Sequence, residues 1–299
     1  MLIPHDEEYA VYKGDCIPHM MADMPPQSVD FSVFSPPFPS LFAYTSSEAD
    51  IGNSEDLAGE AKLHLSFFYK AIARVLKPGR IIVVHVMQIP GLVRNGDKGI
   101  FDYRGLNIRM AQRAGLVYEY DWTYTKNPQA QAIRTHSHSL LFVSLERDRA
   151  ISRGALGDYL IKFSAPGDNA VPIDSPNEIS RQDWIDWAEA SWSWHDIRET
   201  HTLNSTEAKG ENDTKHICPL QLGLIERLVL LYSNPGEIVF SPFAGIGSEG
   251  YMSLMHKRRF YGCELKDEYH AAALRNLDKA IAVRAEAERS LFDEVEATP

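Results

Sequence analysis

The stretch IVFSPFAGIGSEGYMSLMHKRRFYGCE, residues 238–264, decides the fold class of this chain. It predicts a buried strand, a glycine-rich turn, a helix and a second strand, which together form one β-α-β unit. Gly245, Gly247 and Gly250 give the turn the pattern GxGxxG, and glycines let the backbone approach a ligand where a Cβ atom would clash. Glu264 ends the second strand, where a carboxylate can accept hydrogen bonds from both hydroxyls of a ribose. The unit therefore predicts a site for an adenosine-containing cofactor.

The other strands of the sheet must come from upstream, because the residues that follow Glu264 read mostly as helix. The segment VDFSVFSPPFPS, residues 29–40, predicts a buried strand that ends in Ser-Pro-Pro-Phe. We therefore predict an α/β fold with a parallel or mixed sheet that helices cover on both faces. The other predicted elements are a helix from residue 57 that stops at Pro78-Gly79, an apolar strand over 81–89, a helix and a strand separated by glycine over 101–126, and a strand over 137–146.

The segment 149–215 differs in character from the chain on either side of it. Its first part is rich in turn residues, and its second part holds four of the five tryptophans of the chain. We predict that the segment is an insertion with a small core of its own. We also predict that its tryptophans pack in a core or between domains rather than stack on bases. They are Trp184, Trp187, Trp192 and Trp194.

Charge is distributed unevenly along the chain. The net charge of −11 taken alone argues against a nucleic-acid partner, yet Lys70–Lys162 holds fifteen Lys and Arg against seven Asp and Glu. This local excess fits either a basic binding face or ordinary solvated helix surfaces. Three cysteines without a CxxC pair support neither a zinc site nor a disulfide framework, so we expect no metal.

The chain shows no sign of a membrane segment. Its longest apolar runs fall well short of the ~20 residues that span a bilayer. The acidic N-terminus also lacks the apolar core of a signal peptide. We therefore expect a cytoplasmic protein with no membrane partner.

The Ser-Pro-Pro-Phe turn has the composition of a rigid loop with few hydrogen-bond donors. Pro36 and Pro37 lack N–H groups and stiffen the chain, while Ser35 offers a hydroxyl and Phe38 an aromatic ring. Taken in isolation, the turn could simply end a strand. In an open α/β sheet, however, ligands bind beyond the carboxyl ends of the strands. Because Ser35–Phe38 and Phe243–Gly247 both follow strands, we predict that the two loops lie side by side at one edge of the sheet.

The order of these motifs resembles that of the DNA amino methyltransferases, in the beta permutation of the family. Ser-Pro-Pro-Phe comes first, and Phe-Ala-Gly-Ile-Gly at 243–247 comes late. Gly-Asp-Cys at 14–16 and the helix-forming segment 216–233 also resemble family elements. The resemblance implies a permuted Rossmann-like sheet that depends on S-adenosyl-L-methionine. Residues 1–148 would carry the catalytic loop, 149–215 an inserted target-recognition region and 216–299 the cofactor-binding unit.

The resemblance also implies the chemistry, which is methyl transfer to an exocyclic amino group of a base in double-stranded DNA. Ser35 Oγ and the Pro36 carbonyl would accept the two N–H bonds of the amine, Pro37 would leave that surface without a donor, and Phe38 would stack on the base. Because the amino group is buried in a duplex, the base must be flipped out. The implied cofactor-binding residues are Asp15, Cys16, Phe243, Ala244, Gly245, Gly247, Ser248 and Glu264.

The sequence leaves the identity of the base open. In the family, Ser at the first position of the motif is associated with cytosine N4, and Asp or Asn with adenine N6, so we favour cytosine and keep adenine as the alternative. The chain departs from many relatives at Ser241, where they have Asp, and Glu249 could offset that loss. We also expect a homodimer by resemblance. The candidates for DNA contacts are Arg134, Arg147, Arg149, Arg153 and Lys162.

Three other functions fit part of the sequence. A methyltransferase acting on RNA or on a protein glutamine could use the same acceptor loop, although such enzymes usually carry the cofactor motif first. An NAD-dependent oxidoreductase fits the GxGxxG pattern and leaves Ser35–Phe38 without a role. A nucleic-acid-binding module without catalysis would not need Ser35.

Overall fold

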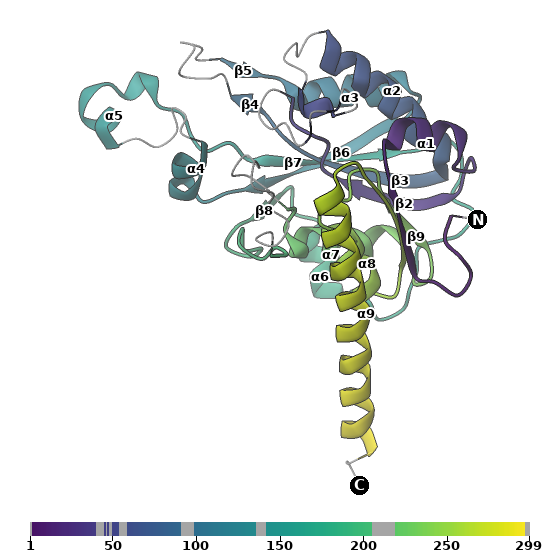
Figure 1. The fold of residues 1–299 in the computed structure, drawn as a ribbon. Coiled ribbons are helices and arrows are strands. Elements are labelled where there is room, and N and C mark those ends of the chain that lie inside the picture. Colours follow the sequence, from purple (N-terminus) through teal and green to yellow (C-terminus); the bar gives the residue numbers. More distant parts are fainter. Residues whose placement is uncertain are drawn as a thin grey trace.

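A computed structural model shows one large mixed sheet in the order β1-β10-β9-β2-β3-β7-β6-β8, and a small sheet β4-β5 (Figure 1). The described residues are 2–39, 45, 47, 50–53, 59–90, 99–135, 142–204 and 219–296. The strands are β1 Tyr9–Lys13, β2 Val29–Phe34, β3 Leu76–Met87, β4 Ile89–Pro90, β5 Ile100–Phe101, β6 Val117–Thr125, β7 Asp158–Ser164, β8 Ser191–Ser193, β9 Ile238–Ser241 and β10 Arg259–Glu264.

The helices cover both faces of the sheet, as the sequence predicts (Figure 1). Successive side chains of a strand point to opposite faces. Along β2, Phe31 and Val33 therefore pack in the cluster that holds the α7 leucines, while Phe34 packs against Phe68 of α2. None of the described helices has the length and apolar composition needed to cross a bilayer. The helices are α1 Cys16–Ala22, α2 Glu60–Val75, α3 Tyr103–Arg113, α4 Pro128–Thr135, α5 Phe142–Arg147, α6 Arg181–Trp187, α7 Leu222–Tyr232, α8 Ser248–Met255 and α9 Asp267–Glu296, with the short turns η1 Ile51–Asn53 and η3 Arg149–Ile151.

The register of the parallel strands brings the two ends of the sequence together. β2 pairs with β9, with Phe31 opposite Val239, and β1 pairs with β10, with Tyr9 opposite Phe260. The late β-α-β unit thus lies between the first two strands of the chain. Because β2 and β9 are parallel neighbours, the loops that follow them leave the sheet at the same edge.

The structure corrects the prediction of a strand over 137–146. The described part of that segment, residues 142–146, lies in the helix α5 instead. A short apolar run does not distinguish a strand from a helix by its period, which explains the error. The strand that pairs antiparallel with both β3 and β6 is β7, Asp158–Ser164.

The segment 149–215 contributes to the main sheet, through β7 and through β8 at one edge. Three of its tryptophans, Trp187, Trp192 and Trp194, share the core of the sheet rather than form one of their own. Trp192 is buried, and its ring centroid lies 5.4 Å from that of Trp122 in β6. Trp184 is 62% exposed and takes no part in this core.

Candidate active site

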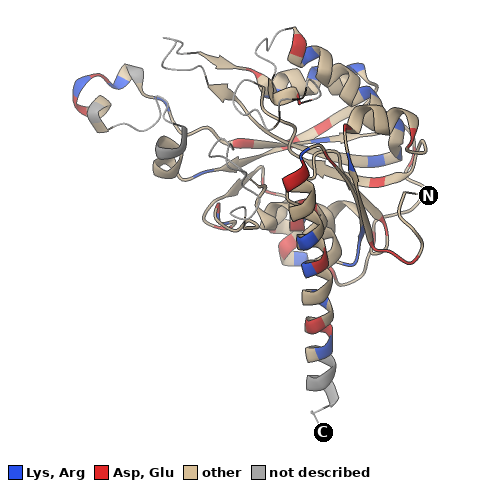
Figure 2. Ribbon diagram, viewed as in Figure 1, with Lys and Arg blue, Asp and Glu red and all other residues tan. Residues whose placement is uncertain are grey.

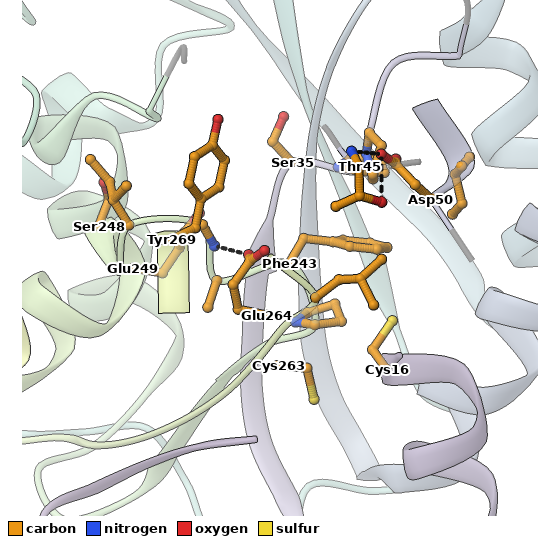
Figure 3. A pocket seen from close by; sticks show the side chains of 18 of the residues that line it. Cys16, Ser35, Thr45, Asp50, Phe243, Ser248, Glu249, Cys263, Glu264 and Tyr269 are labelled. Carbon is orange, nitrogen blue, oxygen red and sulfur yellow. Dashed lines mark hydrogen bonds between the residues drawn. The ribbon is translucent and has the colours of Figure 1, made fainter. Parts of the chain in front are cut away.

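A pocket opens at the carboxyl ends of β2, β9 and β10, and both predicted loops line it (Figure 3). Ser35 and Phe38 come from the loop after β2, and Phe243 and Gly245 from the loop after β9. The convergence of these two loops was the central structural prediction, and the structure agrees with it. The other lining residues include Gly14, Asp15, Cys16, Pro36, Pro37, Thr45, Asp50, Ile51, Pro219, Leu220, Pro242, Ala244, Ile246, Ser248, Glu249, Cys263, Glu264, Leu265 and Tyr269.

The glycine-rich loop and Glu264 form a rigid unit at the base of the pocket. The Glu264 carboxylate accepts hydrogen bonds of 2.8 Å from the backbone N–H groups of Gly245 and Lys266. Gly245 has φ +55°, and a Cβ atom built on it would meet no atom within 4 Å, so its surface is open to a ligand. Gly247 is not among the lining residues. It has φ +87° and begins α8, where a Cβ atom would press on the backbone of Ala273 at 3.2 Å.

Three carboxyl groups line the same pocket, the buried Asp50 and Glu249 and the partly buried Glu264 (Figure 3). Burial raises the pKa of Glu264 to about 7, against the opposing effect of its backbone hydrogen bonds. Burial also raises the pKa of Glu249 to about 8, with a smaller contribution from the nearby Glu264 carboxylate. Carboxyl oxygens placed in this way can accept hydrogen bonds from the hydroxyl groups of a bound ligand.

The start of α1 and the start of α8 complete the pocket wall. The Asp15 carboxylate caps α1 by accepting a hydrogen bond of 2.9 Å from the Ile17 N–H group. Cys16 is buried, and burial raises the pKa of its thiol. Ser248 Oγ, at the start of α8, is buried and has no hydrogen-bond partner among the described residues. A buried hydroxyl in a pocket wall is available to a bound ligand.

The Ser-Pro-Pro-Phe loop is held from behind by Tyr103 of α3. The Tyr103 hydroxyl donates a hydrogen bond of 2.8 Å to the Pro37 carbonyl, and its ring centroid lies 5.6 Å from that of Phe38. Tyr103 is fully buried, whereas Phe38 is partly exposed. The loop is therefore fixed on its inner side, while the Phe38 ring remains available on its outer side.

Ser35 is also the first member of a hydrogen-bonded series that the sequence analysis missed. Ser35 Oγ lies 3.0 Å from His85 Nδ1 and 3.1 Å from the His85 carbonyl oxygen. His85 Nε2 lies 2.7 Å from Asp158 Oδ2, which lies 2.6 Å from Lys126 Nζ. Burial raises the pKa of Asp158, but Lys126 and His85 more than offset this effect and hold it below its ordinary value. The available signal was a single imidazole in the otherwise apolar strand 81–89.

Two further pocket residues lie in a long loop and were not predicted from the sequence. Thr45 and Asp50 belong to the loop after Ser35–Phe38, where the Asp50 carboxylate accepts hydrogen bonds from the N–H groups of Thr45 and Gly52 at 2.7 and 2.9 Å. Such loop residues follow no periodic pattern that could assign them to a site. Among the residues that the structure describes, no group of three His, Cys, Asp or Glu side chains could hold a metal ion.

The predicted DNA contacts differ in their surroundings. Arg147 and Arg149 are exposed, at the end of α5 and in η3, in a part of the chain that projects from the sheet (Figure 2). Arg153 is partly buried and donates to the Gly154 carbonyl. Lys162 belongs to β7, where it forms an ion pair of 2.7 Å with Glu119 and lies over the Tyr232 ring, so it has a structural role. Arg134 lies in α4, but its side chain is outside the described part of the structure.

Comparison with known proteins identifies the family. A sequence model of DNA methylases that modify N6 or N4 amino groups matches residues 29–275. The chain belongs to this DNA methylase family. Over 63 residues it is 43% identical to DNA adenine methyltransferase YhdJ of Escherichia coli K12, and the match covers 21% of either chain. The chain therefore matches about a fifth of the length of that curated relative.

Two solved structures extend the likeness to the whole fold. TTHA0409 of Thermus thermophilus, complexed with S-adenosyl-L-methionine, matches with a TM-score of 0.67 and 20% identity over 92% of this chain and 96% of its own. PvuII DNA methyltransferase, which is cytosine-N4-specific, matches with a TM-score of 0.63 and 17% identity over 93% of this chain and 92% of its own. The predicted family and the predicted methyltransferase sheet are thus confirmed.

Proposed function

We propose that this protein transfers a methyl group from S-adenosyl-L-methionine to an exocyclic amino group of a base in double-stranded DNA, with cytosine N4 favoured and adenine N6 as the alternative. The observation that carries the proposal is the shared pocket of Ser35 and the Gly245–Glu264 unit. The loop that would hold the amino group and the loop that would hold the nucleoside of the cofactor therefore line the same pocket. The family assignment supports the same chemistry.

The pocket residues fit the proposed cofactor. Glu264, held by two backbone N–H groups, would accept the ribose hydroxyls, and the open surface at Gly245 would lie against the nucleoside. Asp50, which lines the same pocket, would offset the positive charge of the methionine part. When bound, S-adenosyl-L-methionine supplies an electrophilic methyl group on a sulfonium. By resemblance, Asp15 would lie near the adenine.

Ser35 and Pro36 would prepare the amine as a nucleophile. An exocyclic amino group is a poor nucleophile because its lone pair is delocalised into the ring. The Ser35 hydroxyl can donate its proton to His85 and keep its oxygen lone pairs for one N–H of the amine. The Pro36 carbonyl would accept the other N–H, and the Phe38 ring would stack on the base. The nitrogen lone pair is then free to point at the methyl group.

Two observations bear on the choice of base. A serine hydroxyl has no charge, whereas Asp at this position would bring a carboxylate. The relatives differ, since YhdJ is an adenine methyltransferase and PvuII methyltransferase is cytosine-N4-specific. The proposal of cytosine N4 therefore depends on Ser35 and on the resemblance.

The way in which the DNA is held is also part of the proposal. The base would have to leave the duplex to reach Ser35. The exposed Arg149, at the start of the proposed target-recognition region 149–215, and Arg147 just before it would contact phosphates beside the base. The chain is proposed to act as a homodimer, by resemblance alone.

The decisive experiment is incubation of the purified protein with labelled S-adenosyl-L-methionine and unmethylated bacterial DNA, followed by mass spectrometry of the nucleosides. We expect N4-methylcytosine, and N6-methyladenine would support the alternative. Label in RNA or in protein, with none in DNA, would refute the proposal. Binding of NAD in place of S-adenosyl-L-methionine would favour the oxidoreductase, and Ser35→Ala should abolish transfer if Ser35 holds the amine.

A further inference from the structure

The series that starts at Ser35 crosses the sheet in strand order. Ser35 follows β2, His85 lies in β3, Asp158 begins β7 and Lys126 follows β6, and these four strands are neighbours in the sheet. His85 is 9% exposed and Asp158 1% exposed, so both are shielded from water. His85 does not line the pocket and reaches it only through Ser35.

The contacts of this series set the protonation of the imidazole. Asp158 carries its negative charge, because Lys126 and His85 hold its pKa low. A carboxylate is an acceptor only, so His85 Nε2 must donate to it across 2.7 Å. In the neutral imidazole, Nδ1 is then without a proton and can accept the hydrogen bond from Ser35 Oγ.

Methyl transfer to an amino group creates a proton that must leave the nitrogen. Ser35 touches the amine in the proposed complex, but a serine hydroxyl cannot hold a second proton. An aspartate at this position could take the proton itself. A serine can pass the proton on only to a base that lies behind it.

We propose that His85 is a positioning residue that takes this proton through Ser35, with Asp158 and Lys126 holding the imidazole in place. This inference rests on the proposed function. As the methyl carbon leaves sulfur and bonds to nitrogen, the amine N–H proton passes to Ser35 Oγ, and the original Ser35 proton passes to His85 Nδ1. The sulfonium becomes a neutral thioether, and the positive charge resides on the imidazolium beside the Asp158 carboxylate.

The geometry around Ser35 also accommodates the protonated state. Once His85 Nδ1 carries a proton, it donates to Ser35 Oγ, and the serine hydroxyl can no longer donate to it. The His85 carbonyl oxygen, 3.1 Å from Ser35 Oγ, offers the hydroxyl a second acceptor. Both states of the pair are therefore hydrogen-bonded. The imidazolium returns its proton to water after the products leave.

The first test determines the tautomer of the His85 imidazole in the protein without ligand. Nuclear magnetic resonance of the ¹⁵N-labelled histidine rings, with His85 assigned by its loss in His85→Asn, should show Nε2 protonated and Nδ1 bare. A proton on Nδ1 in the neutral ring would overturn the inference. This readout requires no activity.

The second test separates proton transfer from hydrogen bonding. In His85→Asn the amide oxygen can accept the Ser35 hydrogen bond but cannot hold a proton, whereas His85→Ala removes both abilities. We expect single-turnover transfer to fall about 100-fold or more in both variants, with unchanged affinity for S-adenosyl-L-methionine and for DNA. Added imidazole should restore part of the rate of His85→Ala, and it should leave His85→Asn unchanged because its side chain fills the space.

A matched control is His256→Asn. His256 is partly buried and, like His85, is hydrogen-bonded to a carboxylate, that of Glu226 at 3.1 Å, but it lies outside the pocket. Its transfer rate should equal that of the wild type. Full activity of His85→Asn beside an active wild type would refute this inference alone. A wild-type protein that methylates no DNA would refute the proposed function, and this inference with it.

Discussion

Replacing Glu249 by glutamine should stabilise the protein, and the gain should grow with pH. Glu249 is 5% exposed, and burial raises its pKa to about 8, against an ordinary value of 4.5. Above pH 4.5 the unfolded chain ionises this group while the folded protein keeps it protonated. Stability is therefore lost progressively as pH rises from 4.5 to 8. Glutamine has the same shape and cannot ionise, so it removes this loss.

The size of the effect follows from proton linkage. The gain in unfolding free energy should be ~1 kcal/mol at pH 5, ~3 kcal/mol at pH 7 and ~4 kcal/mol at pH 8, from 1.36 kcal/mol per unit of pKa difference. Urea unfolding of both proteins at the three pH values measures it. Glu178→Gln is the control of opposite sign, because Arg258 holds the pKa of Glu178 below its ordinary value despite partial burial. That variant should lose stability at neutral pH and regain it in acid. A difference for Glu249→Gln that does not vary with pH would refute the reasoning.

Three further predictions concern the cofactor, the turn and the DNA. Glu264→Gln should weaken binding of S-adenosyl-L-methionine about 10- to 100-fold in calorimetry, because an uncharged amide replaces the carboxylate that would accept the ribose hydroxyls; unchanged affinity would exclude Glu264 from the ribose site. Gly247→Ala should cost about 1–3 kcal/mol of unfolding free energy, because φ is +87° at this position. Gly154→Ala, where a Cβ atom would meet no atom within 4 Å, should leave the unfolding free energy unchanged. Equal effects of the two substitutions would contradict the strain argument. Replacing both Arg147 and Arg149 by alanine should lower the slope of log K against log salt by about 2 in DNA titrations, and an unaltered slope would show that neither contacts a phosphate.

The parts of the site that the sequence predicted are those with a local pattern. The glycine-rich turn between a strand and a helix can be recognised from its own residues alone. The same holds for the two prolines that follow a strand. The rule that ligands bind at the carboxyl edge of a parallel sheet then placed Ser35 and Gly245 in one pocket. The permuted order of the motifs then indicated the family.

The parts that the sequence did not predict depend on contacts between distant residues. His85 belongs to an apolar strand, and only the neighbouring β7 gives it a partner in Asp158, 73 residues away. β7 itself lay inside a segment predicted as an insertion, because turn residues on either side of it obscured the strand. Asp50 lies in a loop, and loops have no periodic pattern from which the direction of a side chain could be predicted.

The position of β9 and β10 between β2 and β1 has a consequence for synthesis of the chain on the ribosome. β2 has no neighbour on one side until residues 238–241 have emerged, and β1 pairs with nothing until 259–264 follow. An incomplete chain therefore carries exposed strand edges that can pair with other chains. Truncation before β10 should yield aggregates rather than a smaller folded domain, and the last step of folding should be the slow pairing of β9 with β2 and of β10 with β1.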